Sequence, residues 1–206
     1  MFISFLSMWL FACAKTTELS KAPISEAPAL KEAAENTVVD EKIDVIEFEV
    51  QAFKLDMRDD SRIGFVGSKI TKSHTGEFKT FSGDIGIADD EVMTLDVEID
   101  MSSVETDHPK LTEHLKTADF FDVVQFTKAT FTASNFENGN ITGVLDFHGF
   151  QNEISFPAEI IVGEKSASIT AEFAINRQLW EVSYSGRKDD LIKDDVLITI
   201  DAKFGE

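Results

Sequence analysis

The stretch MTLDVEIDM (Met93–Met101) decides the fold class, because its apolar and polar residues alternate without a break. Every second side chain from Met93 onward is apolar, and the residues between them are threonine or acidic. Successive side chains of a β-strand point to opposite faces, so one face of this segment is predicted to lie in a core and the other in water. The segment is therefore predicted to be one strand of an antiparallel sheet.

The same two-residue period recurs on both sides of this stretch, with turn residues between the runs. Runs of this kind extend from residues 47–55 to residues 196–204 and amount to about eight strands. Asn138-Gly139 predicts a tight hairpin between two of them, and the glycine-interrupted run over 75–87 predicts one bent strand. These features predict an all-β fold, an eight-stranded antiparallel barrel, because closure removes the exposed sheet edges. A two-sheet sandwich buries the same faces and is the alternative.

The stretch TDHPKLTEHLKTADFFDVVQF (Thr106–Phe126) interrupts the strand pattern. Leu111, Leu115 and Ala118 recur at helical intervals, and Pro109 suits a first helical turn. One short helix is therefore predicted at about residues 108–118. The rings of Phe120 and Phe121 follow it between two aspartates, which predicts an apolar plug near the barrel mouth.

Composition excludes one class of partner and characterises the interior. The 206 residues include 38 acidic and 19 basic side chains, a formal net charge of −19. Coulomb repulsion then opposes binding to nucleic acid or to an anionic membrane surface, so no nucleic-acid partner is predicted. The chain has 18 Phe but only two Trp and one Tyr, so most buried rings carry no polar group that needs a partner.

The N-terminal segment predicts export. MFISFLSMWLFA is apolar and uncharged, is too short to span a bilayer, and fits the core of a signal peptide over residues 1–13. Leu10-Phe11-Ala12-Cys13 resembles a bacterial lipobox, which predicts acylation of Cys13 and a membrane tether through it. The alternative is an apolar N-terminus with a buried thiol. Residues 14–45 are predicted to be a disordered tether and residues 46–206 the barrel domain.

Four segments carry a resemblance to a known family. They are SKITKSHTGEFKTFSG (68–83), DHPKLTEHLKTADFFDVVQF (107–126), TGVLDFHGFQNEISFP (142–157), and NRQLWEV (176–182) with DDLIKDDVLITIDAKF (189–204). Together they resemble the YceI-like family of polyisoprenoid-binding proteins. The resemblance implies a lipocalin-like barrel with an elongated apolar pocket, in proteins that are often exported and of which some bind isoprenoid chains. The chain departs from the family pattern at Thr127, where proline is common, and at Glu181, where glycine is common.

The candidate ligand-binding residues are inward-facing apolar side chains with two polar side chains for a head group. The apolar candidates are Phe65, Phe78, Phe81, Leu95, Val97, Leu115, Phe120, Phe121, Phe131, Leu145, Phe147, Phe156, Phe173 and Trp180. The polar candidates are His114 and Arg177, since a guanidinium pairs well with phosphate or carboxylate. Alternatively the rings fill a dry core, Arg177 pairs with one of the many acidic residues, such as Asp189 or Asp190, and His114 caps or packs against the helix.

Enzyme chemistry finds little support in the sequence. The four histidines lie without metal-ligand spacing, no HExxH is present, and Cys13 precedes the predicted core. The predicted function is non-enzymatic binding, transport or sequestration of an apolar ligand, either an isoprenoid (a quinone or polyprenyl chain) or a fatty-acyl chain, in a bacterial cell envelope, as a periplasmic protein or a membrane-anchored lipoprotein. No obligatory cofactor is predicted. A protein-interaction scaffold with a filled core and an enzyme acting on a hydrophobic substrate are the alternatives, and a homodimer is left open.

Overall fold

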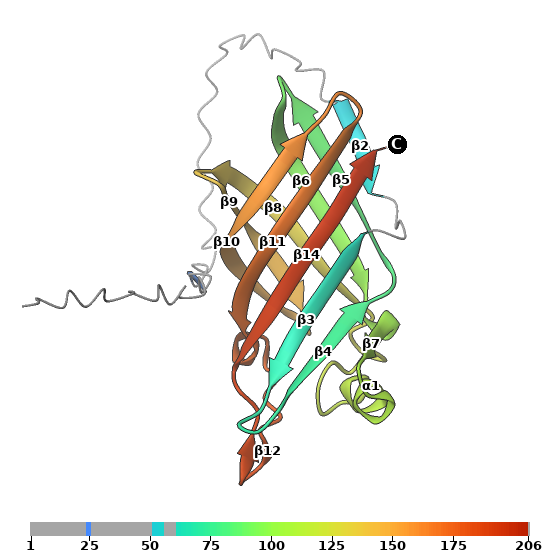
Figure 1. Cartoon of the computed structure of the whole chain (residues 1–206), viewed down its shortest axis with the longest axis vertical. Coiled ribbons are helices and arrows are strands. Elements are labelled where there is room, and N and C mark those ends of the chain that lie inside the picture. The colour runs from blue at the N-terminus through green and yellow to red at the C-terminus, as the bar shows by residue number, and fades with distance from the viewer. Residues whose placement is uncertain (1–23, 26–50, 56–60, 206) are drawn as a thin grey trace, which may run out of the picture.

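The computed structural model describes residues 24–25, 51–55 and 61–205 (Figure 1). The predicted signal peptide with Cys13, and the predicted tether apart from residues 24–25, lie outside the described residues. The helix α1 spans Pro109–Leu115, and single 3-10 turns span Met101–Ser103 and Arg177–Trp180. The strands are β1 (Ile24–Ser25), β2 (Gln51–Leu55), β3 (Arg62–Ser68), β4 (Ser73–Phe78), β5 (Phe81–Ala88), β6 (Glu91–Asp100), β7 (Val104–Thr106), β8 (Lys128–Glu137), β9 (Asn140–Phe147), β10 (Phe150–Val162), β11 (Ser166–Asn176), β12 (Gly186–Arg187), β13 (Asp190–Leu191) and β14 (Asp195–Gly205).

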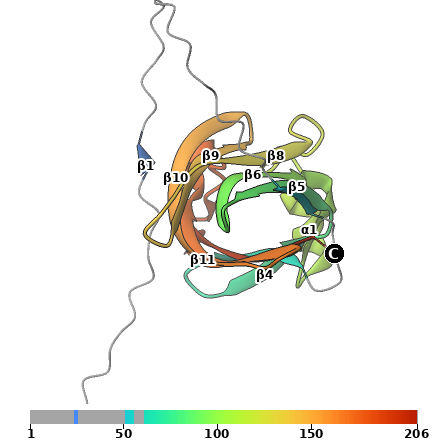
Figure 2. The same cartoon turned by 90° about the horizontal axis from the view of Figure 1, so that it is seen from above.

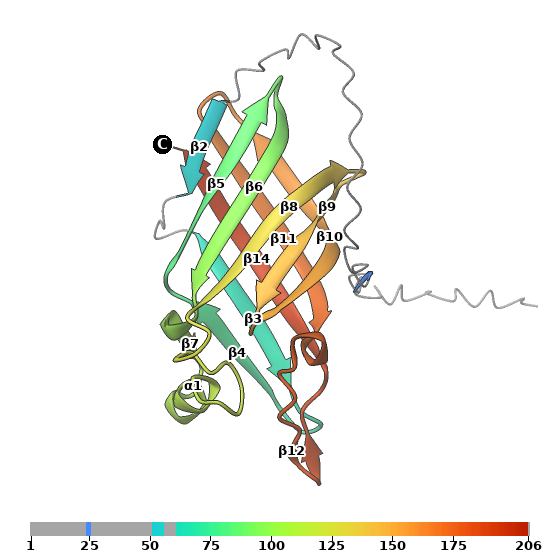
Figure 3. The same ribbon diagram turned by 180° about the vertical axis from the view of Figure 1, so that it is seen from behind.

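Most strands pair antiparallel in one curled sheet, in the order β2-β5-β6-β8-β9-β10-β11-β14-β3-β4-β7, with β1 also paired to β10. β12 and β13 form a separate two-stranded sheet. Seen from above, the curled sheet wraps around a central space (Figure 2). β5, β6, β8 and β9 form the wall seen from behind, and β10, β11, β14 and β3 the wall facing the viewer in Figure 1 (Figure 3). The all-β barrel predicted from the alternation is confirmed, with more strands than the eight expected.

One pairing inside the curled sheet joins distant parts of the chain. Residues 62–66 of β3 pair with residues 197–201 of β14. Elsewhere neighbouring strands are mainly joined by tight turns, as the alternation with turn residues predicted. The predicted Asn-Gly hairpin is confirmed, since Asn138 and Gly139 both adopt positive φ between β8 and β9.

The prediction of one bent strand over 75–87 is wrong. The chain breaks at Lys79-Thr80 into β4 and β5, which pair with different strands. The physical reason is a competing set of hydrogen bonds: the Lys79 backbone N–H donates to the Ser103 carbonyl at 3.2 Å, and the Thr80 N–H donates to Ser103 Oγ at 3.1 Å. These N–H groups leave the ladder, so the chain turns a corner there.

The helix is shorter than the predicted 108–118 and ends at Leu115. Pro109 occupies its first turn, as predicted. The following residues form tighter turns, in which the Thr117 N–H donates to the His114 carbonyl at 3.1 Å and the Phe120 N–H to the Thr117 carbonyl at 3.0 Å. These turns direct Phe120 back toward the barrel, where it is buried.

The barrel has two unlike ends, which we name from their position in Figure 1. The upper end carries the β5–β6 and β10–β11 turns, and the lower end carries α1, the β3–β4 turn and β12 (Figure 1). Ile85 and Ile87 of β5 and Ala167 of β11 are buried members of one large core cluster, on strands that reach the upper end. A second cluster formed by Val104, Leu115, Phe120 and Val182 lies at the lower end.

Candidate ligand cavity

A cavity of about 230 Å³ runs inside the barrel toward its lower end. Its lining comes from nearly every strand of the barrel and is apolar apart from Arg177. Because alternate residues of each strand face inward, one inner row of side chains per strand surrounds the space. An apolar cavity of this kind excludes water and accepts a hydrocarbon chain.

Most of the apolar candidates predicted from the sequence line this cavity. They are Phe65, Phe78, Leu95, Val97, Leu115, Phe120, Phe121, Phe131, Leu145, Phe147, Phe156 and Phe173. Phe81 is buried in the core but does not line the cavity. Trp180 is fully buried beside it, where its indole N–H donates to the Leu145 carbonyl at 3.1 Å. That these residues bind a ligand stays a prediction.

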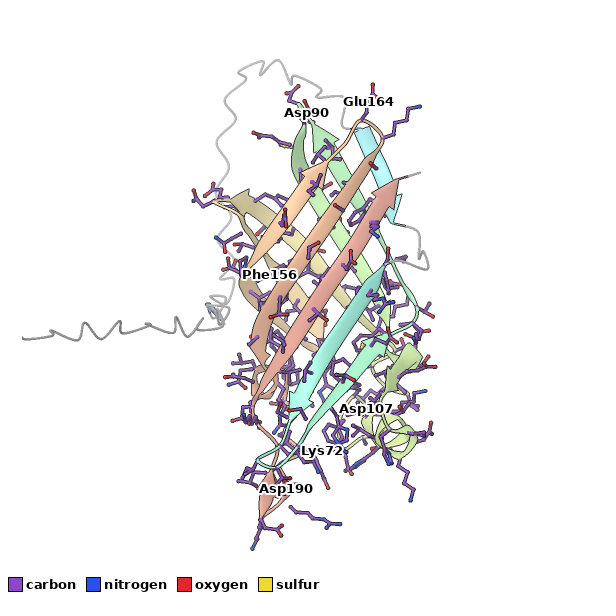
Figure 4. The ribbon with its side chains drawn as sticks, viewed as in Figure 1. Lys72, Asp90, Asp107, Phe156, Glu164 and Asp190 are labelled. Atoms are coloured by element: carbon purple, nitrogen blue, oxygen red, sulfur yellow. The ribbon has the colours of Figure 1, made fainter. Side chains whose placement is uncertain are left out.

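Aromatic rings form a layer across the middle of the barrel. The rings of Phe156 and Phe173, from β10 and β11, are stacked with centroids 4.0 Å apart and planes 9° from parallel. The ring centroids of Phe131, from β8, and Phe156 lie 5.6 Å apart. Figure 4 shows Phe156 inside the barrel wall at mid-height. Stacked and tilted rings at these separations attract each other, so this layer forms a stiff wall of the cavity.

A second group of rings lies lower, around the plug. The centroid of the Phe121 ring lies 5.6 Å from that of Phe147, 6.3 Å from that of Phe78 and 6.4 Å from that of Phe65. Gly76 makes room for the Phe65 ring, because a Cβ at that glycine would lie 2.2 Å from a Phe65 ring carbon. Gly76 is thus explained by close packing of the Phe65 ring, and Gly83 by the close approach of the β6 backbone, where a Cβ would lie 2.5 Å from the Asp96 carbonyl oxygen.

The plug predicted from Thr106–Phe126 lies beside the cavity. Leu115 and Phe120 are buried, Phe121 is half-buried, and all three line the space. The side chains lie against Val104 and Val182, so the segment closes the lower end of the barrel over the cavity. The filled core that a pure scaffold requires is therefore absent from the described part of the barrel.

His114 lies outside the cavity. Its Nε2 is 2.9 Å from Asp119 Oδ2, and its ring meets the edges of Phe120 and Tyr184 at centroid distances of 5.0 and 5.1 Å. The alternative in which His114 packs against its own segment describes these contacts. Its role as a head-group ligand is not supported by this geometry.

Arg177 reaches the cavity, but its guanidinium holds a loop. Nε donates to the Lys193 carbonyl at 3.1 Å, Nη1 donates to the Val182 carbonyl, and Nη2 lies 3.4 Å from Asp194 Oδ1. The alternative in which Arg177 pairs with an acidic residue describes this contact, but the partner is Asp194 and neither of the two named examples, Asp189 and Asp190. Burial lowers the pKa of Arg177 below its ordinary value, and the Asp194 carboxylate opposes that shift. Arg177 thus fixes residues 182–194 over the lower end of the cavity.

Sequence reasoning missed a further, mainly aliphatic part of the lining. It comprises Ile63, Gly64, Gly67, Ile99, Met101, Ala129, Ile141, Ile154, Ile169, Ile175, Val182, Ile192, Val196, Ile198, Ile200, Ala202 and Phe204. Most of these lie on alternating positions of strands that the sequence already predicted. The period-two signal was therefore sufficient to find them, but the candidates were chosen mainly among the large rings.

Neither a metal site nor a membrane-spanning helix is found in the part of the chain that the structure describes. No three His, Cys, Asp or Glu side chains there gather closely enough to hold a metal ion. None of the helices in those residues has the length and apolar character needed to cross a bilayer.

A comparison with protein families decides where this barrel belongs. The YceI-like domain profile matches residues 53–204, which is most of the chain and the whole of the cavity. The chain belongs to the YceI-like family. Curated relatives include a UPF0312 protein of Vibrio campbellii, 33% identical over 96 residues (42% of this chain, 49% of the relative), and protein YceI of Escherichia coli, 29% identical over 92 residues (42% and 48%). These matches span about half the length of the relatives.

Solved structures of YceI-like and related barrels resemble the whole domain. The superposition with BcnA of Burkholderia cenocepacia covers 72% of this chain and 98% of the BcnA chain, with a TM-score of 0.64 and 20% sequence identity. A polyisoprenoid binding domain from Saccharophagus degradans covers 74% and 97% with a TM-score of 0.62 at 18% identity. The YceI protein of Campylobacter jejuni covers 64% and 84% with a TM-score of 0.57 at 28% identity. The first two likenesses establish the fold.

Proposed function

We propose that this YceI-like protein binds one apolar chain, an isoprenoid such as a quinone or polyprenyl tail or another lipid-like ligand, inside its barrel. The observation that carries the proposal is the cavity, which is lined by apolar side chains from all sides and covered at the lower end by Leu115, Phe120 and Phe121. Membership of the YceI-like family and the likeness to the polyisoprenoid binding domain from Saccharophagus degradans support the same ligand class.

The energetics suit a hydrocarbon ligand without a charged anchor. Burial contributes roughly 0.8 kcal/mol per methylene, so each five-carbon unit contributes on the order of 3 kcal/mol before ordering costs. The donors of Arg177 that face the loop are already engaged by Lys193, Val182 and Asp194. Affinity then comes from chain burial, and selectivity from the shape of the ring layers.

The proposal describes binding and transfer rather than catalysis. A non-enzymatic carrier or sequestering role in the cell envelope follows if Cys13 is acylated and tethers the chain to a membrane. Intact mass spectrometry of chain recovered from the membrane fraction tests the tether. An acylated N-terminal Cys13, lost together with membrane recovery in Cys13→Ser, is expected, and an unmodified cysteine would overturn this part.

The cavity is tested by filling it. Full-length protein is purified, extracted with organic solvent, and analysed by mass spectrometry, and a polyprenyl alcohol is then titrated into the emptied protein. Ile198→Trp places a large ring into the cavity, and Ile161→Trp places the same ring on an outer position that is 60% exposed. We expect Ile198→Trp to weaken binding more than tenfold and Ile161→Trp to leave it unchanged. An empty extract with no binding in the unsubstituted protein, or equal binding in both variants, would contradict the proposal.

A further inference from the structure

Two turns lie side by side at the extreme lower end of the barrel (Figure 1). The β3–β4 turn, residues 69–72, is joined to the β12–β13 hairpin by hydrogen bonds. The Ile70 N–H donates to the Leu191 carbonyl at 3.2 Å, and the hydroxyl of Thr71 donates to Asp190 Oδ1 at 2.9 Å. Lys69 also forms an isolated bridge with Ile192. Residues 69–72 and 186–193 thus form one surface, which we call the basic tip.

The basic tip has a charge opposite to that of the chain. It contains five basic residues, Lys69, Lys72, Arg187, Lys188 and Lys193, and two acidic residues, Asp189 and Asp190, in a chain with 38 acidic and 19 basic residues. The Asp190 carboxylate is engaged inside the tip by Thr71 and by Lys69 at 3.8 Å. Figure 4 shows Lys72 and Asp190 at this end and the acidic Asp90 and Glu164 at the other.

Two large aliphatic side chains of the tip face water among these charges. Ile70 is 66% exposed and Leu191 is 45% exposed, and they come from the two hydrogen-bonded turns. Exposed aliphatic groups beside several basic side chains match the two layers of an anionic bilayer surface, phosphate outside and acyl chain beneath.

The tip also adjoins the cavity. Ile192, the residue after Leu191, lines the cavity, as does Gly67 at the end of β3 before the other turn. A bilayer touching Ile70 and Leu191 would therefore lie next to the lower end of the apolar space, on the side closed by the plug.

We propose that the basic tip docks on the surface of an anionic lipid bilayer, with Ile70 and Leu191 in the headgroup layer. The overall charge of −19 does not prevent this, because at physiological salt charges beyond about 8 Å are largely screened. The acidic Asp107, which interacts with Lys72, is itself hydrogen-bonded to His74. The proposal goes beyond ligand binding and does not depend on it, since bilayer contact and cavity binding are measured separately.

A label on the tip tests the contact. Full-length chain carrying Cys13→Ser and Ile70→Cys is labelled with an environment-sensitive dye, and the matched control carries Cys13→Ser and Ile161→Cys on the outer face of β10. The vesicles are phosphatidylcholine with one-third phosphatidylglycerol, or phosphatidylcholine alone. The dye responds only when its own position enters the bilayer. Binding of the chain to vesicles through the apolar N-terminal segment therefore does not produce the blue shift expected at position 70. We expect a blue shift and quenching by spin-labelled lipid only at position 70 and only with the anionic vesicles.

Neutralising the tip tests the electrostatic part. Each basic residue near an anionic surface contributes about fivefold to binding, so Lys72→Gln, Arg187→Gln and Lys188→Gln together are expected to weaken the position-70 signal on the order of 100-fold. The matched control Arg62→Gln, Lys128→Gln and Lys165→Gln removes the same charge elsewhere and is expected to change it less than threefold. Circular dichroism checks that both variants are folded.

Two results would overturn the proposal. One is a dye response that is the same at positions 70 and 161 or the same on both vesicle types. The other is a response of position 70 to polyglutamate with none to the vesicles, which would assign the basic tip to an acidic protein partner instead.

Discussion

At the upper end of the barrel, Ile85, Ile87 and Ala167 are buried in the core and do not line the cavity, whereas at the lower end aromatic rings of the plug border it. Ile85 is completely buried in the first region, while Phe121 is half-buried in the second. The same period-two alternation builds both regions. The difference shows that one sheet can have the closely packed residues that stabilise the fold near one end and the ligand cavity near the other.

The largest effect is expected from truncating the upper end. Ile85→Ala removes a fully buried side chain from close packing, so the free energy of unfolding should fall by about 2–5 kcal/mol. Urea denaturation measures this, with Ile161→Ala on the exposed face as the control, expected within about 0.5 kcal/mol. Equal losses in the two variants would mean that the upper end does not carry the stability.

A somewhat smaller effect is expected from Arg177→Met. The change leaves the carbonyls of Val182 and Lys193 without their donor in a buried place and should cost about 2–3 kcal/mol. Because Arg177 positions the loop, hydrogen exchange should rise over residues 182–193 and stay unchanged in β5. A uniform rise across the barrel would instead assign Arg177 to general stability.

Opening the plug should affect binding more than stability. Phe121→Ala removes a half-buried ring that already faces empty space, so the unfolding free energy should fall by only about 1–2 kcal/mol. Loss of the contact surface should weaken polyprenyl alcohol binding about tenfold, measured by titration. Phe81→Ala, at a buried position outside the cavity, is the matched control, and its expected pattern is the reverse: larger destabilisation with affinity retained.

The smallest effect concerns a surface pair at the lower end. His74 Nδ1 lies 2.7 Å from Asp107 Oδ1, and this hydrogen bond lowers the pKa of the Asp107 carboxyl below its ordinary value. A depressed carboxyl pKa adds stability above the pKa of the unfolded chain, about 4, and the addition is lost as the pH falls through the folded value. Asp107→Asn should therefore lower Tm by about 1–3 °C at pH 7.

The control for this pair is the same measurement in acid. At pH 3 the Tm difference between the two proteins should shrink, because the unsubstituted Asp107 begins to be protonated there as well. A difference that grows toward low pH would show that the substitution acts through something other than the carboxylate charge.

The strands and most of the ring layers could be predicted because alternation fixes which face of a strand is buried. In Val196–Phe204 the pattern was sufficient. In Met93–Met101 it was right for Leu95 but wrong for Met93, which is 53% exposed because the β5–β6 register shifts at Gly86/Ile87. The break at Lys79-Thr80 could not be predicted, since it depends on Ser103, which lies 23 residues beyond Thr80 in the chain. The loop over residues 182–194 was missed for a similar reason. Arg177 holds it through the backbone carbonyls of Val182 and Lys193, and every residue has such a carbonyl whatever its side chain.

Alternation also could not distinguish a cavity from a filled core. It gives the direction of a side chain but not the distance to the side chain opposite. The space depends on how Phe65 lies against Gly76 and how Phe156 stacks on Phe173. The family departure at Glu181 shows a related limit, because this residue adopts a left-handed φ of 54°, the region in which glycine is common, without a glycine.

The pairing of residues 62–66 with residues 197–201 sets the order in which the molecule is completed during synthesis. β14 supplies the partner for β3, so a nascent chain exposes its inner row of rings until β14 has been synthesised. Such long-range pairing is slow and leaves apolar faces open in the meantime. The ligand space is thus a late product of folding, and a chain truncated before β14 is expected to aggregate rather than to form a smaller barrel.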